Sequence, residues 1–212
     1  METLQYIKEK KIIAIVRGVY GDDALRLSEA LLKGGIGLIE VTFDQTGGFY
    51  ETADTIMSIQ KHFGSSFLPG AGTVMTEEQV RIAAEAGAEY IISPNVSEAV
   101  IRETKKRALV SMPGAMTPGE IAMAHDFGAD IVKVFPASVL GPSYIKAVRA
   151  PLGHIDLMAV GGVNEENAAD FIRAGAIGVG VGGNLVKKSY IAEGKFDVIT
   201  ETARKLCLCT TL

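Results

Sequence analysis

The chain has few cysteines, few histidines and no long apolar run. Its two cysteines, Cys207 and Cys209, lie too close together for an easy disulfide and have no His or Cys nearby to complete a metal site. The three histidines, His62, His125 and His154, are scattered along the chain, so they give no ligand spacing either. We therefore predict neither a disulfide framework nor a metal centre.

An excess of positive charge is also missing. The formal net charge is -4 and the pI is about 5.5, which argues against nucleic acid or an anionic membrane as the main partner. No apolar run reaches the roughly eighteen residues that a membrane helix needs. The first ten residues lack the apolar region of a signal peptide. We expect a soluble, cytoplasmic protein.

What the chain does have is a recurring phrase. An amphipathic stretch, a glycine and a short apolar run follow one another over residues 29–40, 83–93, 124–133 and 171–181. In each copy the glycine falls where a helix needs a C′ residue in the left-handed conformation, just before a strand. These are the helix-to-strand joints of βα units, and no linker or low-complexity stretch marks a domain boundary between them.

Eight apolar runs are candidate strands: 12–17, 36–42, 66–72, 89–93, 108–112, 130–135, 155–160 and 177–181. Helical patterns lie between them, for example over 22–33, 76–86, 117–127 and 164–174. Eight such alternations predict an α/β fold, a single (β/α)8 TIM barrel domain over residues 1–212. A doubly wound open sheet is the alternative, but no G-x-G-x-x-G follows the first run and we predict no cofactor.

Lys133 interrupts the apolar run 130–135, which we expect to be a buried strand. A lysine there must place its ammonium group in a low-dielectric interior, where burial disfavours the charged form. A neutral lysine amine is a nucleophile that can form a Schiff base with a carbonyl compound. The alternative is a lysine that pairs with a buried carboxylate for structural reasons.

Glu40 lies near the end of the second apolar run. Chemistry in a TIM barrel sits at the carboxyl ends of the strands, and alternate strands share interior layers, so Glu40 and Lys133 are expected to face the same interior space. Period-two alternation adds the neighbours on that face: Ile36, Leu38, Thr42, Ile131 and Phe135. We favour a functional pair over a structural one, because buried ion pairs are weak sources of stability.

Other candidates stand at the ends of other runs. Arg17 ends the first run and carries a guanidinium suited to a carboxylate or phosphate. Gly70 and Gly72 would let the backbone approach a ligand, and Thr73 offers a hydroxyl beside them. Pro94 follows the fourth run and is expected to form a pocket wall.

Paired glycines follow the last two runs. They are Gly161 and Gly162 after the seventh run, and Gly182 and Gly183, followed by Asn184, after the eighth. We expect the second pair to open a short helix. This arrangement matches the phosphate site common in TIM barrels, where backbone N–H groups hold the anion. A packing role for the glycines is the alternative.

Seven phrases carry a resemblance to a known family: 13–18, 38–42, 70–74, 92–94, 112–114, 132–137 and 161–163. Together they resemble the 2-keto-3-deoxy-6-phosphogluconate / 2-keto-4-hydroxyglutarate aldolases, in order and over nearly the whole chain. The resemblance implies a class I aldolase, a metal-free TIM barrel that is usually a homotrimer and uses a Schiff-base lysine.

The resemblance also implies roles. Lys133 would attack the keto carbon of a small keto acid, and Glu40 would move protons during cleavage to pyruvate and an aldehyde. The expected substrates are 2-keto-3-deoxy-6-phosphogluconate, which gives glyceraldehyde 3-phosphate, and 4-hydroxy-2-oxoglutarate, which gives glyoxylate. The implied substrate contacts are Arg17 and Thr73 at the carboxylate, and Pro94 and Phe135 around the pyruvyl part.

Three positions depart from the family pattern. Asp44 stands where many relatives carry an arginine that helps to hold the substrate carboxylate. Val160 replaces the threonine that precedes the glycine pair of the seventh strand, and Asn184 replaces a serine after the second pair. The last two put the phosphate preference in question and leave the Schiff-base chemistry untouched.

Other functions remain open at this point. A related aldolase could act on a different 2-keto-3-deoxy sugar acid. A metal-dependent aldolase or an epimerase would need a cluster of His and carboxylates at the strand ends. A sugar-phosphate-binding barrel without catalysis would not need a buried nucleophile.

Overall fold

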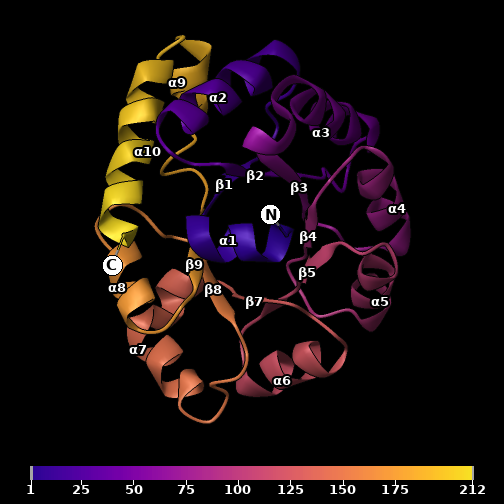
Figure 1. Cartoon of the computed structure of the whole chain (residues 1–212), viewed down its shortest axis with the longest axis vertical. Helices are drawn as coiled ribbons and strands as arrows, with labels where there is room; N and C mark the ends of the chain where they lie inside the picture. Colours follow the sequence, from indigo (N-terminus) through magenta and orange to yellow (C-terminus); the bar gives the residue numbers. More distant parts are fainter. Residues whose placement is uncertain (1, 212) are drawn as a thin grey trace.

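The computed structural model describes residues 2–211, so the outermost residues of the predicted domain, 1 and 212, lie outside it. The strands are β1 (Ile12–Val16), β2 (Leu38–Thr42), β3 (Leu68–Gly72), β4 (Tyr90–Ile92), β5 (Val110–Met112), β6 (Gly114–Ala115), β7 (Val132–Val134), β8 (Leu157–Val160) and β9 (Gly178–Val181). The helices are α1 (Thr3–Lys10), α2 (Gly21–Lys33), α3 (Tyr50–Phe63), α4 (Glu77–Glu85), α5 (Glu98–Lys106), α6 (Pro118–Asp126), α7 (Ala137–Arg149), α8 (Ala168–Arg173), α9 (Lys188–Ala192) and α10 (Phe196–Thr210), with a short 3-10 helix at Gly64–Ser66. Helices surround a ring of strands (Figure 1).

All strands are parallel, in the order β5-β4-β3-β2-β1-β9-β8-β7-β6. Only Pro113 separates β5, which pairs with β4, from β6, which pairs with β7. Proline has no N–H to donate, so it interrupts the ladder, but its carbonyl still accepts the Lys133 N–H at 2.9 Å. The two short strands are therefore one bent barrel strand, and the predicted eight-stranded TIM barrel is confirmed.

Two of the predicted helix starts depend on capping. Thr76 caps α4 and Thr117 caps α6, each in a capping box with the side chain three residues later, Gln79 and Glu120. The threonine hydroxyl accepts a helix N–H, and the Gln or Glu side chain accepts the N–H of the threonine, so two otherwise unpaired donors are satisfied. These helices lie within one residue of their predicted bounds.

The predicted start of the helix 164–174 is wrong. Asn164 accepts the N–H groups of Glu166 and Asn167 at 2.9 and 3.2 Å, as a capping residue would. The residues that follow Asn164 form a separate turn, and α8 begins only at Ala168. Asparagine side chains stabilise such turns as readily as they cap helices, so the sequence signal was the same for both.

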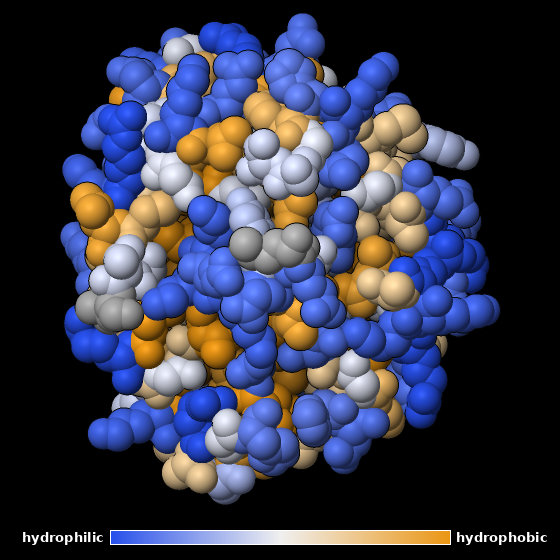
Figure 2. Space-filling view, viewed as in Figure 1, coloured by the Kyte–Doolittle hydropathy of each residue, from blue (hydrophilic) through white to orange (hydrophobic). Residues whose placement is uncertain are grey.

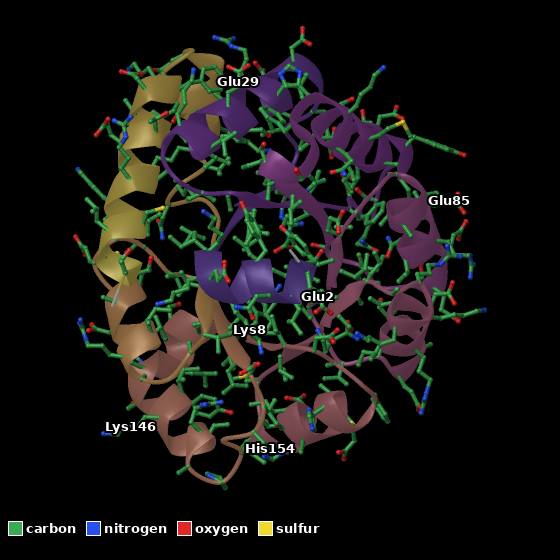
Figure 3. All side chains as sticks on the ribbon, in the orientation of Figure 1. Glu2, Lys8, Glu29, Glu85, Lys146 and His154 are labelled. Carbon is green, nitrogen blue, oxygen red and sulfur yellow. The ribbon has the colours of Figure 1, made fainter. Side chains whose placement is uncertain are left out.

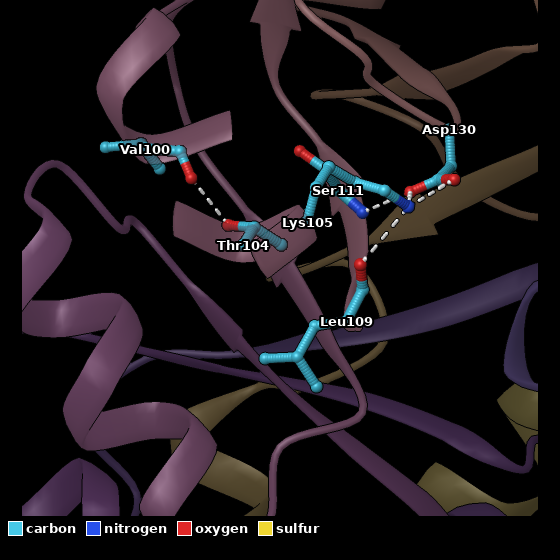
Figure 4. Close-up of polar contacts among 6 residues, drawn as sticks. All are labelled: Val100, Thr104, Lys105, Leu109, Ser111 and Asp130. Carbon is cyan, nitrogen blue, oxygen red and sulfur yellow. Dashed lines mark hydrogen bonds and ion pairs between the residues drawn. The ribbon is translucent and has the colours of Figure 1, made fainter. Parts of the chain in front are cut away.

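The Asp130 carboxylate anchors the amino end of β7 (Figure 4). It accepts the N–H of Ser111 at 2.8 Å and hydrogen bonds from Lys105 Nζ at 2.6 and 2.7 Å. The same ammonium lies 3.5 Å from the Leu109 carbonyl. Asp130 is thus paired with Lys105. It does not pair with Lys133, which lies three residues further along the chain.

Helix α1 closes the amino end of the barrel (Figure 1). Its Ile7 is fully buried among the interior residues, and its Lys8 pairs with Asp156 next to β8 at 2.7 Å. Lys8 projects from α1 on the β8 side (Figure 3). Hydrophilic side chains gather over α1 on the outer surface (Figure 2). One face of this short helix is therefore the floor of the barrel.

The barrel interior has its own apolar cluster, separate from the larger cluster between strands and helices. Its members are Ile7, Ile13, Leu38, Tyr90, Ile92, Val110, Met112, Ile131, Met158 and Val160. Leu38 and Ile131 lie there as predicted. Ile36 instead belongs to the outer cluster, because β2 begins only at Leu38 and the alternation does not extend back to residue 36.

The glycines of β3 make room for large interior side chains. A Cβ on Gly70 would overlap the Tyr90 ring, and a Cβ on Gly72 would overlap the Glu40 carboxyl group. The prediction that these glycines admit a ligand to the backbone is therefore wrong. Glycine is needed at these positions because side chains of the neighbouring strands fill the space beside them, as close packing of a barrel interior requires.

The glycines of β9 likewise make room for large interior side chains. A Cβ on Gly178 would lie 2.9 Å from Met158, and one on Gly180 would lie 2.9 Å from Val160. Two glycine-containing strands thus face the bulky side chains of β4 and β8 and of Glu40. The interior is filled and leaves the carboxyl end as the place where a substrate can enter.

We expect Gly72→Ala to lower stability and activity together, because the added methyl must displace Glu40. Overpacking of this kind costs about 1–3 kcal/mol, or a fall in Tm of several degrees. Thermal unfolding measures it. Gly119→Ala is the matched control, since a Cβ there meets no atom within 4 Å. An unchanged Tm and rate for Gly72→Ala would contradict this packing.

Candidate active site

Lys133 lies in the barrel wall at the centre of β7. Its neighbours across the ladder are Gly114 of β6 and Met158 of β8. The side chain is only 7% exposed, and Nζ lies 5.0 Å from the centre of the Phe135 ring. The amine is therefore enclosed, with the Phe135 ring beside it, near the carboxyl end of the barrel.

Glu40 lies at the centre of β2 and is 2% exposed. Burial raises the pKa of its carboxyl group, and the positive charges of Lys133 and Arg17 act in the opposite direction. Its Oε2 is buried without a hydrogen-bond partner among the described residues. A carboxyl group in this state can hold a proton at a higher pH than an exposed one, and it has an oxygen free to bond with another molecule.

Arg17 and Thr73 meet at the ends of β1 and β3. Arg17 Nη2 donates to Thr73 Oγ1 at 3.1 Å. Asp44 lies in the loop after β2 and accepts the N–H and hydroxyl of Thr46 at 2.9 and 2.8 Å. The hydrogen bonds from Thr46 lower the pKa of Asp44, and Arg17 adds a smaller effect in the same direction. Asp44 is therefore a carboxylate at neutral pH.

Pro94 and Phe135 follow the carboxyl ends of β4 and β7. Pro94 is half-buried, and its carbonyl lies so close to Gly114 that a Cβ there would overlap it. Phe135 is 39% exposed at the end of β7, with its ring 3.1 Å from the position of a Cβ on Gly161. Because Gly161 has no side chain, the Phe135 ring can lie against it at the carboxyl end of the barrel.

The two glycine pairs differ in conformation. Gly161 and Gly162 have φ values of 97° and 73°, in the left-handed region that favours glycine. After the second pair, the predicted helix does not begin: Leu185 and Val186 donate to the Gly182 carbonyl at 2.9 Å in a single turn, and α9 starts only at Lys188. The prediction of a helix opening at this pair is wrong.

Asn184 ties the two loops together. Its Nδ2 donates to the carbonyl of Val163 at 3.0 Å, so the amide links the loop after β9 to the loop after β8. The side-chain amide is used in this contact.

A hollow of about 480 Å³ opens between the carboxyl ends of β1 and β9. Its lining consists of Ile15, Arg17, Gly182, Gly183, Val186, Lys187 and Lys188. Within residues 2–211 it therefore has three cations and no carboxylate. Lys187 and Lys188 were missed in the sequence, although their position just after the glycine pair could have drawn attention to them. A hollow of about 520 Å³ between α2 and α10 is larger, but no strand residue lines it.

Two kinds of feature are absent from residues 2–211. No three His, Cys, Asp or Glu side chains gather there as a metal-binding group. None of the helices in that part of the chain has the length and apolar character to cross a membrane. The chemistry-bearing groups at the strand ends are an amine, a carboxyl group and a guanidinium, from Lys133, Glu40 and Arg17.

The structure is similar to a solved aldolase with a covalent intermediate. That protein is the 2-keto-3-deoxy-6-phosphogluconate (KDPG) aldolase of Legionella pneumophila, with pyruvate captured at low pH as a carbinolamine. The two chains are 25% identical, with a TM-score of 0.87 over 97% of this chain and 98% of the other. Fold and strand-end residues together place this protein in the class of TIM-barrel aldolases.

The family follows from the sequence match. Residues 4–202 match the family model described as KDPG and KHG aldolase, where KHG is 2-keto-4-hydroxyglutarate. The chain belongs to this family and is an aldolase, a carbon–carbon lyase, which confirms the resemblance.

Two curated relatives carry a more specific name. The probable 2-dehydro-3-deoxy-6-phosphogalactonate aldolase of Rhizobium meliloti is 41% identical, over 84% of this chain and 83% of the relative. The 2-dehydro-3-deoxy-6-phosphogalactonate aldolase of Escherichia coli is 36% identical, over 90% of this chain and 91% of the relative.

The raised pKa of Glu40 predicts a pH-dependent stability. Relative to Glu40→Gln, the parent is most stable below the ordinary carboxyl pKa of 4.5 and loses that advantage as pH rises through the raised value. Urea unfolding from acid to neutral pH measures the difference. Glu120→Gln is a control of opposite sign, because hydrogen bonds from Met116 and Thr117 lower the pKa of Glu120. Parallel pH profiles of parent and Glu40→Gln would refute the raised value.

Proposed function

We propose that the protein is a class I aldolase that cleaves a 2-keto-3-deoxy acid through a Schiff base on Lys133. The observation that carries this proposal is the pair of buried, chemically complementary groups, Lys133 and Glu40, in one interior at the carboxyl end of the barrel. The covalent carbinolamine in the Legionella relative supports it.

The reaction follows from those two groups. Lys133 Nζ attacks the C2 keto carbon, and loss of water gives an iminium ion. The C4 hydroxyl loses its proton, the C3–C4 bond breaks, and its electron pair moves to the iminium nitrogen to give an enamine, while C4 leaves as an aldehyde. Protonation of the enamine at C3 and hydrolysis then release pyruvate. Glu40 takes and returns the protons in these steps.

The remaining residues would fix the pyruvyl part. Arg17 and Thr73 hold the substrate carboxylate, since the guanidinium offers several N–H donors in one plane. Pro94 and Phe135 pack against the carbon skeleton near Lys133. Loss of water from the carbinolamine is favoured in a site enclosed by such apolar groups.

The galactonate-derived substrate is the first candidate. The two relatives that carry its name are 41% and 36% identical to this chain, against 30% for the curated relatives named for the phosphogluconate substrate. The two substrates are epimers at C4, the carbon that becomes the aldehyde. Val160 is buried in the barrel interior without the hydroxyl of the usual threonine, so it cannot hydrogen bond to a C4 substituent. KDPG and 4-hydroxy-2-oxoglutarate are the other candidates.

The phosphate end of such a substrate would occupy the hollow beside Gly182 and Gly183. Lys187 and Lys188 line it, and a dianion there would offset the mutual repulsion of the cations. Backbone N–H groups of the two glycine pairs would add donors.

The homotrimer typical of the family belongs to this proposal too, and light scattering tests it.

Borohydride trapping with pyruvate tests the proposal directly. Reduction should leave a stable pyruvyl adduct on Lys133, located by peptide mass spectrometry, and Lys133→Ala should lose both adduct and cleavage. Lys146→Ala, which removes an exposed lysine of α7, should keep both. A folded parent without an adduct would favour a barrel that binds sugar phosphates without catalysis.

The lysines of the hollow predict a selective loss. Lys187→Ala and Lys188→Ala should each raise KM for glyceraldehyde 3-phosphate about tenfold in the aldol direction, the usual worth of a charged hydrogen bond. KM for unphosphorylated glyceraldehyde should stay the same. Lys61→Ala, exposed on α3, is the control. Equal effects on both aldehydes would place the phosphate elsewhere.

A further inference from the structure

Thr73 has a backbone conformation that threonine rarely adopts. Its φ is +55°, in the left-handed region, where a β-branched side chain is strained. Such a conformation persists only where neighbouring groups hold it, and it is common beside functional sites. The groups that hold Thr73 are therefore of interest for the site.

Gln45 holds the Thr73 carbonyl, and Gln79 in turn holds Gln45. Gln45 Nε2 donates to Thr73 O at 2.8 Å, and Gln79 Nε2 donates to Gln45 Oε1 at 3.2 Å. Gln79 is fully buried, and its Oε1 accepts the N–H groups of Met75 and Thr76 at 2.6 and 3.2 Å. The relay thus begins in the capping box of α4, a rigid element.

The same relay reaches Arg17. The Thr73 hydroxyl accepts from Arg17 Nη2 at 3.1 Å, so the direction of the guanidinium depends on where Thr73 lies. The loop after β2, residues 43–49, contains no second cation for a carboxylate, and its Asp44 Oδ1 accepts hydrogen bonds from Thr46. Arg17 would then hold the substrate carboxylate without help from a cation of that loop, so its orientation matters more.

We propose that Gln45 is a positioning residue for pyruvate recognition: through Thr73 it sets the Arg17 guanidinium for the substrate carboxylate. The inference rests on the proposed aldolase function. Gln45 touches Thr73 and not the substrate, so its effect is on the affinity for the keto acid. Ordering a long, flexible arginine before binding removes part of the entropy cost of binding.

The test compares two affinities. In Gln45→Ala and in Gln45→Met, which keeps the side-chain volume but has no N–H to donate, the pyruvate concentration for half-maximal borohydride trapping should rise about tenfold. The KM for the aldehyde and the maximal extent of trapping should stay unchanged. Gln5→Ala removes an exposed glutamine of α1 and is the control.

The outcomes separate the two levels of the proposal. No adduct in the parent overturns the Schiff-base function and this inference with it. An adduct in the parent, with unchanged half-saturation in both Gln45 variants, overturns the inference alone. A parallel rise in the aldehyde KM or a lower Tm also overturns it, because the relay would then support only the loop and the cap of α4.

Discussion

Two ionisable groups, a carboxyl group and an amine, buried inside an apolar barrel are the constraint on which the site depends. Glu40 and Lys133 are nearly inaccessible, and the Glu40 carboxyl shows the energetic consequence in its raised pKa. Glu40 could not sit there unless a neighbour left space, which Gly72 does by having no side chain. Around this pair the interior is filled by apolar side chains of α1 and of several strands.

Much of this arrangement could be predicted from the sequence. The eight strands, the TIM barrel and the positions of Lys133 and Glu40 follow from local patterns: apolar runs, glycines at helix ends and a period of two along a strand. Such patterns persist because each one reflects a contact that the residue makes with the backbone or with a whole layer of the fold. They are least reliable at the ends of elements, as Ile36 and Asn164 show.

Other features could not be predicted because they depend on partners distant in the sequence. Gly70 and Gly72 have the same sequence signature whether they admit a ligand or a neighbouring side chain, and only the positions of Tyr90 and Glu40 decide. Lys187 lines the hollow because its loop folds beside Arg17. The contact between Gln45 and Gln79 joins the loop after β2 to the first turn of α4, thirty-four positions apart, and nothing local to either residue marks it.

The floor made by α1 gives the barrel a single mouth. Ile7 fills the amino end, so molecules reach Lys133 only from the opposite side. Under the proposed chemistry, pyruvate is covalently held at depth while the aldehyde fragment lies nearer the opening. The closed amino end then fixes the order of the kinetic steps. In cleavage the aldehyde leaves first, and in synthesis pyruvate must bind before the aldehyde. Because the barrel is closed at its amino end, the proposed chemistry would follow an ordered two-substrate mechanism without a conformational change to impose the order.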